Sequence, residues 1–502
     1  VPNAAVNGNT ITVVTSTLSA NKYSGYGNQT MVAGTNNAKL GSFTLSAGST
    51  EGINVNTIVI TMSAANAASI TNLTLKDDST GSTLGSIQTT PSASNSFAVN
   101  LPVAAGATKT LSLYANILAG ANAGTIVASV DTTTAGTGMV TGTAASPSTT
   151  ALQTITLGSG SLNVTRGAGD PVSNNVLAGA SSVKVGQFNF AAQNTSYTVS
   201  NLLVLIPANA ATSVTNVTLS YKDVNGATQS ATQALTLPTG TQGSATATFT
   251  GLTMYVPSND SANLDVFVGT PTIASGATSG AAINVTLDDG HGSNTFLATD
   301  AAGNTLAKFN ANNTNIASNG TFYVRKSIPT IAMIPLGLTV PTTGSPIYKF
   351  SVTADPAGAV EWTKFVFNVA TTTASLSSVY LTDDSTGTNL LDNNTTSAST
   401  TATSITIDLT KNATLAQYQQ VAAGATKTYA LYGTVTGWAT GATLTLSLAA
   451  DSATTANAAA GSVSGNIVWS DRSANAHTIS TSDWTNGYLL KNLTSTAVSY
   501  SK

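Results

Sequence analysis

Clusters of acidic residues are the most chemically suggestive feature of the sequence. The letters Asp-Asp-Ser-Thr-Gly occur twice, with carboxylates at Asp77 and Asp78 and again at Asp383 and Asp384. Clustered carboxylates beside backbone carbonyls suit Ca²⁺. The same letters suit a hairpin turn, in which Asp and Ser bond the local backbone and Gly takes a positive φ. Because the Asp-x-Asp-x-Asp-Gly spacing is missing, we favour the turn and keep calcium as the alternative.

A further acidic pair, Asp288 and Asp289, stands just before Gly290 and His291. An imidazole beside carboxylates can ligate a metal. A loop tip explains the same letters, because Asp and Gly are common turn residues. We interpret the cluster as a loop, with calcium at Asp288 and Asp289 as the weaker alternative, and we expect no cofactor.

Catalytic groups are scarce. The chain has no Cys, and His291 and His477 are its two His. Without Cys, neither a disulfide framework nor a thiolate metal site can form. Neither His is accompanied by a Gly-x-Ser-x-Gly elbow, and no phosphate-binding or dinucleotide-binding loop occurs. We therefore predict that the protein is not an enzyme.

The composition points to an uncharged, well-hydrated surface. Charged residues make up 7% of the 502 residues, and 17 basic against 20 acidic side chains give a net charge of −3. A nucleic-acid-binding protein would carry a basic stripe, which is missing here. No apolar run reaches the length of a membrane-spanning helix. Ser, Thr and Asn must hydrate the surface instead, which suits an extracellular protein whose copies repel one another weakly.

Internal repeats give the organisation of the chain. The letters VAAGATKT occur at residues 103–110 and again at 421–428, each followed by an alternating apolar strand. A looser copy of the strand before Asp77 lies at residues 215–226. The order of these features is the same in each copy, which indicates duplicated domains.

The alternation of apolar and polar residues, the β-branched content and the Gly, Asn and Asp punctuation all predict strands. About seven or eight strands in a unit of this size are typical of an immunoglobulin-like sandwich. We therefore predict an all-β chain of three tandem immunoglobulin-like β-sandwiches with an extended N-terminal strand and a Trp-containing C-terminal tail. The expected segments are the extended strand at 1–34, sandwiches at 35–155, 156–318 and 319–460, and the tail at 461–502.

An extended segment stands before each predicted sandwich, at residues 10–14, 161–165 and 321–325. The second and third can pair with a sandwich on either side of them. No sandwich precedes the first in this sequence. A Thr- and Val-rich strand of this kind either pairs within its own domain or adds to the sheet edge of another molecule.

We expect residues 9–17, which include this first segment, to form a donor strand that adds to a sandwich of the adjacent subunit, most simply its third. Ile11 and Val13 would be buried, Thr12 would belong to the same donor strand, and Val14 would lie at the rim or on the opposite face. A neutral strand could add to an almost uncharged surface without electrostatic cost.

The C-terminal tail contains two of the four Trp residues, Trp469 and Trp484, followed by Tyr488 and Leu489. Aromatic clusters are favoured both in cores and in interfaces. We expect the tail to pack on the third sandwich, with docking to a neighbouring molecule as the alternative.

The sequence contains residues suited to two covalent modifications. Asn-x-Ser/Thr sequons are frequent, so glycans are possible partners, although a chain rich in Asn, Ser and Thr forms such sequons by chance. Lys109 and Lys427 stand at equivalent positions before a strand and could form isopeptide bonds, but a solvated Lys is the simpler interpretation.

The tail IVWSDRSANAHTISTSDWTNGYLLKNL at 467–493, the letters TFYVRKSIPTI at 321–331 and the opening at 39–62 resemble extracellular surface proteins of candidate-phyla-radiation bacteria. The resemblance implies a secreted, cell-surface, self-assembling protein that forms a surface layer or a filament. The first residue is Val, which we interpret as an N-terminus left after removal of a signal segment.

Taken together, these features predict a secreted structural subunit that forms a homopolymer on the cell surface. The polymer would be a pilus-like filament built by strand addition, or a surface layer. The alternative is a monomeric, stalk-like adhesin that binds carbohydrate or a host protein, for example around Trp469 and Trp484. Neither nucleic acid nor a membrane span is expected.

Overall fold

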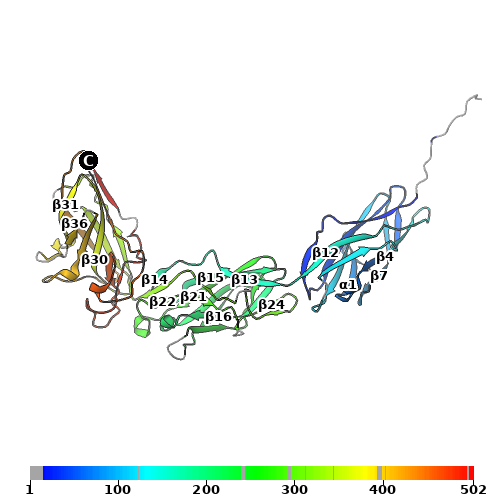
Figure 1. Cartoon of the computed structure of the whole chain (residues 1–502), viewed down its shortest axis with the longest axis horizontal. Helices are drawn as coiled ribbons and strands as arrows, with labels where there is room; N and C mark the ends of the chain where they lie inside the picture. Colours follow the sequence, from blue (N-terminus) through cyan, green and yellow to red (C-terminus); the bar gives the residue numbers. More distant parts are fainter. Residues whose placement is uncertain are drawn as a thin grey trace, which may run out of the picture.

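The computed structural model describes residues 9, 15–121, 124–238, 243–291, 295–310, 313–342, 344–392, 398–401, 403–493 and 497–502. Nearly all of the regular structure is β-strand, and three units lie in a row along the molecule (Figure 1). We call them the first unit (residues 15–158), the second unit (161–325) and the third unit (329–502). Among the described residues no helix is long and apolar enough to cross a membrane. The prediction of an all-β sandwich protein is confirmed.

The first unit pairs two sheets. The strands of its five-stranded sheet are, in spatial order, β1 (Leu18–Lys22), β3 (Ala38–Ala47), β8 (Thr108–Ile117), β5 (Ile70–Asp77) and β6 (Thr83–Gln88). The strands of the opposing sheet are β11 (Ala144–Ala145), β10 (Ala135–Gly138), β4 (Ile53–Met62), β9 (Thr125–Val130), β12 (Thr150–Gly158) and β2 (Gln29–Val32), with β7 (Ser94–Val103) also paired to β4. One short helix, α1 (Ala64–Ala68), connects β4 to β5.

The second unit repeats the five-stranded sheet. Its strands are β13 (Ser161–Arg166), β15 (Val183–Gln193), β21 (Ser261–Gly269), β17 (Asn216–Lys222) and β18 (Thr228–Ala234). The opposing layer consists of β25 (Thr305–Leu306), β24 (Leu297–Asp300), β16 (Tyr197–Ile206), β23 (Thr286–Leu287) and β26 (Ile316–Ala317), with β19 (Ala245–Phe249) and β20 (Met254–Val256) on β16. A three-stranded sheet of β14 (Asn174–Leu177), β27 (Phe322–Arg325) and β22 (Ala282–Ile283) completes the unit.

The third unit has the same order once more. Its five-stranded sheet contains β28 (Pro329–Met333), β29 (Tyr348–Ala354), β36 (Thr426–Thr436), β31 (Ser375–Asp383) and β32 (Thr388–Asn389). The opposing sheet contains β33 (Ala398–Thr400), β34 (Ser404–Asp408), β30 (Val360–Thr372), β37 (Thr443–Leu448) and β40 (Val498–Ser501), with β35 (Gln419–Val421), β38 (Ile467–Ser470) and β39 (Trp484–Asn486) also attached. Short 3-10 helices lie at Ala208–Ser213, Ile273–Ser275, Leu409–Lys411 and Ala460–Ser462.

Each unit encloses a large apolar cluster between its two layers. Phe43 and Phe97 lie in the first cluster, Phe188 and Phe249 in the second, and Trp362 in the third, all at most 1% exposed. Burying a side chain of this size contributes roughly 1.5–3 kcal/mol. The alternation that predicted strands therefore marks the residues that fill the cores.

Residues 321–325 were expected to lead the third sandwich, but the structure places them elsewhere. They form β27, which pairs in parallel with β14 and antiparallel with β22 of the second unit. The strand that leads the third unit is β28, which pairs with β29. The expected leading-strand assignment of 321–325 is therefore wrong, because a period of two identifies a strand but not the neighbour with which it pairs.

The ends of the chain also differ from the expected segments. Residues 18–32 include β1 and β2, which belong to the sheets of the first unit, so only part of 1–34 precedes the sandwich. Residues 467–501 include β38, β39 and β40, which are strands of the third unit's sheet. The tail is thus a part of the third sandwich and not an appendage to it.

Candidate functional site

The two junctions between units are each made by one nearly continuous strand. β12 closes the first unit, and after Ser159 and Gly160 the chain enters β13, which leads the second unit. β27 closes the second unit, and after residues 326–328 the chain enters β28. A Cβ at Gly160 would overlap the Tyr197 hydroxyl, so the close approach at the first junction requires glycine. We call β12, β27 and β40 the closing strands and β1, β13 and β28 the leading strands.

Arg325, the last residue of β27, is the centre of the junction between the second and third units. The residue is 3% exposed, and its guanidinium donates to Asn457 Oδ1 at 2.8 Å, Thr485 Oγ1 at 3.1 Å and Asn175 Oδ1 at 3.4 Å. It also lies over the ring of Trp469, 5.6 Å from the centroid. Burial lowers the pKa of Arg325 from its usual value. The cation thus joins a strand of one unit to the tail of the next.

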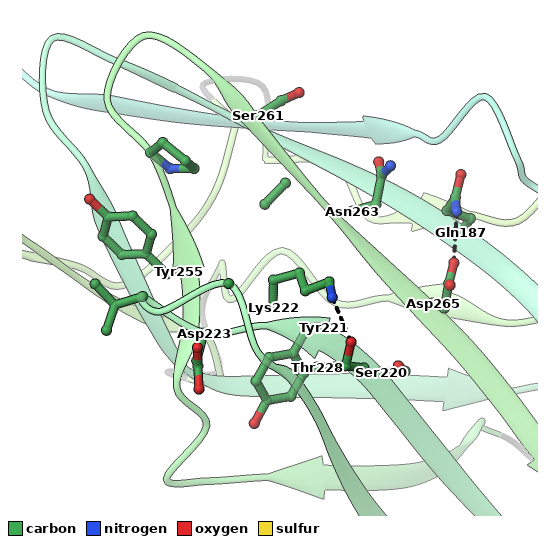
Figure 2. A pocket seen from close by; sticks show the side chains of 14 residues that line it. Gln187, Ser220, Tyr221, Lys222, Asp223, Thr228, Tyr255, Ser261, Asn263 and Asp265 are labelled. Carbon is green, nitrogen blue, oxygen red and sulfur yellow. Dashed lines mark hydrogen bonds between the residues drawn. The ribbon is translucent and has the colours of Figure 1, made fainter.

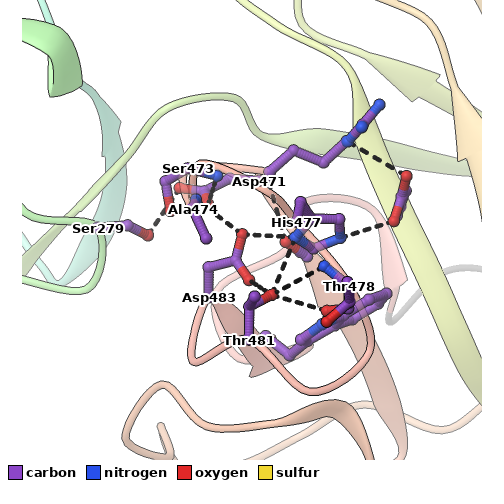
Figure 3. A network of polar contacts seen from close by, with 12 residues as sticks. Ser279, Asp471, Ser473, Ala474, His477, Thr478, Thr481 and Asp483 are labelled. Carbon is purple, nitrogen blue, oxygen red and sulfur yellow. Dashed lines mark hydrogen bonds and ion pairs between the residues drawn. The ribbon is translucent and has the colours of Figure 1, made fainter.

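Asp471 makes a second polar connection at this junction. It accepts hydrogen bonds from Ser279 Oγ of the second unit and from the Lys326 backbone N–H, both at 2.7 Å (Figure 3). Tyr323 and Tyr488 meet edge to face, with centroids 6.5 Å apart. Hydrogen bonds to a carboxylate are stronger than hydrogen bonds between neutral groups. Together with the Tyr323–Tyr488 contact, they hold the third unit against the second.

His477 lies in a buried network next to this junction. Its Nε2 is 2.7 Å from Glu361 Oε2, and its Nδ1 is 2.8 Å from Asp483 Oδ2. Arg472 Nε lies 3.2 Å from Glu361 Oε1. Burial raises the pKa of Glu361 against the opposing effect of His477 and Arg472. Burial also acts to raise the pKa of Asp483, but hydrogen bonds from Thr481 and other groups outweigh it and the pKa is lowered. Both ring nitrogens of His477 thus contact carboxylates, so we infer that the imidazole stabilises the fold of the third unit.

The tail aromatics divide between core and junction. Trp469 and Trp484 are 1% and 0% exposed, and their indole N–H groups donate to Asn486 O at 2.8 Å and Thr478 O at 2.9 Å. Tyr488 and Leu489 are half-buried at the second unit, where the Tyr488 carbonyl accepts from Asn175 Nδ2 at 3.2 Å and Leu489 lines a small cavity. The tail therefore contacts both the third and the second unit.

The first acidic residue of each Asp-Asp-Ser-Thr-Gly copy builds a turn. Asp77 Oδ1 accepts from the backbone N–H and hydroxyl of Ser79, at 2.9 and 2.7 Å, and Asp383 does the same with Ser385 at 3.0 and 2.6 Å. Burial acts to raise the pKa of both Asp, but these hydrogen bonds and a nearby Lys outweigh it, so the pKa of each is lowered. The turn geometry includes Gly81 at φ +71°.

Lysines neutralise these carboxylates. Lys109 lies 3.6 Å from Asp77, and Lys427 lies 3.5 Å from Asp383, with 35% and 38% of the Lys side chains exposed. The same function is performed at the second Asp of each copy, where Lys39 lies 3.7 Å from Asp78 and Lys349 lies 2.7 Å from Asp384. Within the described part of the chain no group of three or more acidic or His residues is placed to hold a metal ion.

The third acidic cluster also makes local turn contacts. Asp288 Oδ1 accepts from the Gly290 backbone N–H at 2.8 Å, and Asp289 Oδ1 accepts from the His291 backbone N–H at 3.0 Å. These contacts are those of a loop tip.

The predicted donor residues Ile11, Thr12, Val13 and Val14 lie outside the residues that the structure describes. Ser16, just after them, is held by a hydrogen bond within the first unit. The Ser16 hydroxyl donates to the Glu51 carboxylate, which also accepts from the backbone N–H groups of Val140 and Thr141 at 2.8 and 3.0 Å. Hydrogen bonds from Ser16 and Thr141 lower the pKa of Glu51 to about 2.

The second unit carries an open groove of about 580 Å³ on its five-stranded sheet (Figure 2). Tyr221, Tyr255 and Pro257 supply apolar surface, and Asn263 and Asp265 supply polar groups. The turn beside this groove begins with Asp223 and Val224, where the first and third units have two consecutive Asp residues. Val224 is 66% exposed.

Sequence reasoning missed the residues that join the second and third units, above all Arg325, Asn457 and Asp471. One signal was available. Arg is rare in this chain, and Arg325 is one of three, at positions 166, 325 and 472. Its partners Asn457 and Thr485 stand 132 and 160 residues further on, and Asn175 stands 150 residues earlier, so no local pattern connects them.

No protein-family model matches the chain, and no curated protein matches it. Among solved structures, the C-terminal domain of the Streptococcus agalactiae antigen I/II polypeptide BspA matches 62% of this chain over 100% of its own length, at 11% identity and a TM-score of 0.20. A tetra-tandem repeat from a large adhesion protein matches 91% of this chain and 80% of its own, at 13% identity and a TM-score of 0.15. The B domain of a biofilm-associated protein matches 61% and 85%, at 11% identity and a TM-score of 0.17. None of these likenesses assigns the chain to a family, and none bears on the resemblance to candidate-phyla-radiation proteins.

Proposed function

We propose that the protein is a structural subunit of the cell surface whose copies join end to end by strand addition, with residues 10–14 as the donor strand. One observation carries this proposal. β1 holds the leading-strand position in the first unit, next to β3, as β13 and β28 do in the other units. Residues 10–14 are therefore surplus to the leading edge of their own sandwich, and a Thr- and Val-rich strand has backbone groups to pair elsewhere.

The architecture supports an extended structural role. Three sandwiches in a row, connected by strands that run from one unit into the next, form an elongated molecule (Figure 1). The surface has few charges, so copies can approach closely without strong repulsion. We propose further that the protein is extracellular, that its copies assemble into a filament, and that it is related to surface proteins of candidate-phyla-radiation bacteria.

Electron microscopy of the protein and of a variant that lacks residues 1–14 tests the proposal. A deletion of residues 1–20 would remove part of β1, so the shorter deletion is the proper variant. We expect filaments from the intact chain and folded single rods from the variant, whose thermal unfolding should match that of the intact chain. Equal polymers from both chains would overturn strand addition, and flat sheets would replace the filament by a surface layer.

The groove of the second unit favours a second candidate function, an adhesin that binds carbohydrate. Aromatic faces beside amide and carboxylate groups suit a sugar, whose C–H faces stack and whose hydroxyls hydrogen-bond. Tyr255→Ala should then abolish retention on a glycan array while the intact chain is retained. Glycan binding by a chain that stays monomeric at high concentration would put this function first.

A further inference from the structure

We propose that residues 10–13 form a closing strand for the third unit of another copy, beside β37 and in the place that β40 holds. This inference rests on the proposed function and names its acceptor site. It comes from the register of the leading and closing strands, which is the same at both junctions within the chain.

The three leading strands can be aligned through one Phe of the strand beside them. Lys22 pairs with Phe43, Arg166 with Phe188, and Met333 with Phe350. These three Phe residues are all fully buried. In this alignment Leu18, Leu162 and Pro329 are equivalent, since each stands four residues before the residue paired with Phe.

Counting back from these positions identifies the residues that precede each leading strand. Ile11, Ile155 and Phe322 each stand seven residues before the equivalent position (18 − 11, 162 − 155 and 329 − 322). Ile155 lies in closing strand β12 and Phe322 in closing strand β27, and they are 0% and 3% exposed. Ile11 thus has the sequence position of a buried closing-strand residue.

The letters agree with the register. Thr10-Ile11-Thr12-Val13 corresponds to Thr154-Ile155-Thr156-Leu157 of β12, with three identical residues of four. In β12 the Ile is buried, the Leu packs partly against the core, and Thr156 is exposed. The segment therefore has the side-chain pattern of a closing strand for a sandwich other than the first.

The third unit has the closing strand with the fewest neighbouring strands among the described residues. β12 lies between β9 and β2, and β27 lies between β22 and β14. Among the described strands β40 pairs with β37 alone. Its other edge receives one long contact, from Ser501 N–H to Thr339 O at 3.4 Å. Removing β40 breaks one ladder, whereas removing β12 or β27 breaks two.

The pairing of β40 gives the register of the exchange. Tyr500 pairs with Leu444 and Ser501 with Thr443, as Ile155 pairs with Ile126 and Thr156 with Thr125. In the complex Ile11 would oppose Leu444 and Thr12 would oppose Thr443. Residues 14–17 would then connect two copies as Ser159 and Gly160 connect the first two units.

Cysteine pairs test this register, because the chain has no Cys of its own. Directly opposed strand residues have Cα separations of about 4.5–5.5 Å, which a disulfide accepts. Thr12→Cys protein mixed with Thr443→Cys protein should form a covalent dimer on oxidation. Thr12→Cys mixed with Thr125→Cys, the equivalent position of the first unit, is the matched control and should give none.

A disulfide lock tests the exchange separately. Thr443→Cys with Ser501→Cys in one chain should tie β40 to β37, stop assembly when oxidised and release it when reduced. Polymers that need residues 1–14 but show neither the Thr12–Thr443 cross-link nor the effect of the lock would overturn this acceptor site and leave strand addition standing. Cross-linking of Thr12→Cys to Ser501→Cys instead would mean addition outside β40. Polymers that do not need residues 1–14 would overturn the proposed function itself.

Discussion

The two junctions between units have the same kind of strand connection but differ in the side-chain contacts beside it. At the first, Asn194 donates to Ser159 O at 3.0 Å, Asn304 donates to Ala33 O at 3.4 Å, and a cavity of about 280 Å³ remains between the units. At the second, a buried Arg and Asp471 bond residues of both units. The second junction therefore has more directional contacts between its units than the first, and we expect the first to bend more freely.

Arg325→Ala should have the largest effect on this comparison. The substitution leaves the amide of Asn457 and the hydroxyl of Thr485 without their donor and opens a void under Trp469. We expect a loss of roughly 2–4 kcal/mol in the unfolding of the second and third units, measured by urea titration. Arg166→Ala, at an exposed position on β13, is the control and should cost far less. Equal losses from both would mean that the buried cation does not hold the junction.

Asp471→Ala should have a smaller effect. It removes the acceptor of the Ser279 hydroxyl and of the Lys326 backbone N–H, and each buried donor left unpaired costs about 1–3 kcal/mol. Small-angle scattering should show a wider distribution of molecular lengths, since the junction gains freedom. Ser279→Ala removes a single donor and should widen it less, and an unchanged distribution in Asp471→Ala would contradict a rigid second junction.

Glu51 tests the outer end of the first unit, where another copy would dock. Its folded pKa of about 2 lies below the usual 4.5, so its contribution to stability is present above pH 4.5 and is lost as the pH falls toward 2. Glu51→Gln should remove that part of the acid dependence, measured by thermal unfolding between pH 2 and pH 7. Identical pH profiles for the two proteins would show that the Glu51 carboxylate does not contribute to the acid dependence of stability.

Asn304→Ala at the first junction should have the smallest effect. Its side chain donates one long hydrogen bond to the neighbouring unit and one of 3.0 Å to Asp300 Oδ2 in its own turn, so we expect a loss of about 1 kcal/mol or less and an unaltered scattering curve. A large change would show that the first junction is also rigid and would remove the contrast between the two.

The sequence predicted most of the fold because the chain repeats itself. Copies of one strand-turn-strand pattern indicate equivalent sheets. The turns at Asp77 and Asp383 could be predicted because Asp and Ser bond the backbone within the turn itself. The neighbours of a strand were harder. Residues 322–325 have the right period for a leading strand, but Phe322 and Val324 complete the second core.

The junction could not be predicted from the sequence for a related reason. Arg325 contacts Asn457, Thr485 and Trp469, all more than a hundred residues further along the chain, and they come together only when the tail folds onto the third unit. Trp469 lies in the main core cluster of the third unit and Trp484 in a smaller cluster, and the contact of Trp469 with Arg325 of the second unit was not expected from the sequence.

The most direct test of strand addition compares single charges on the two faces of the proposed donor. Ile11→Asp places a carboxylate where Ile155 and Phe322 are buried, and Thr12→Asp places the same charge where Thr156 is exposed. Negative-stain electron microscopy at one protein concentration is the measurement. The account predicts filaments from the Thr12 variant and single rods from the Ile11 variant. Filaments of equal number and length from both would contradict it, because no face of residues 10–13 would then be buried in another copy.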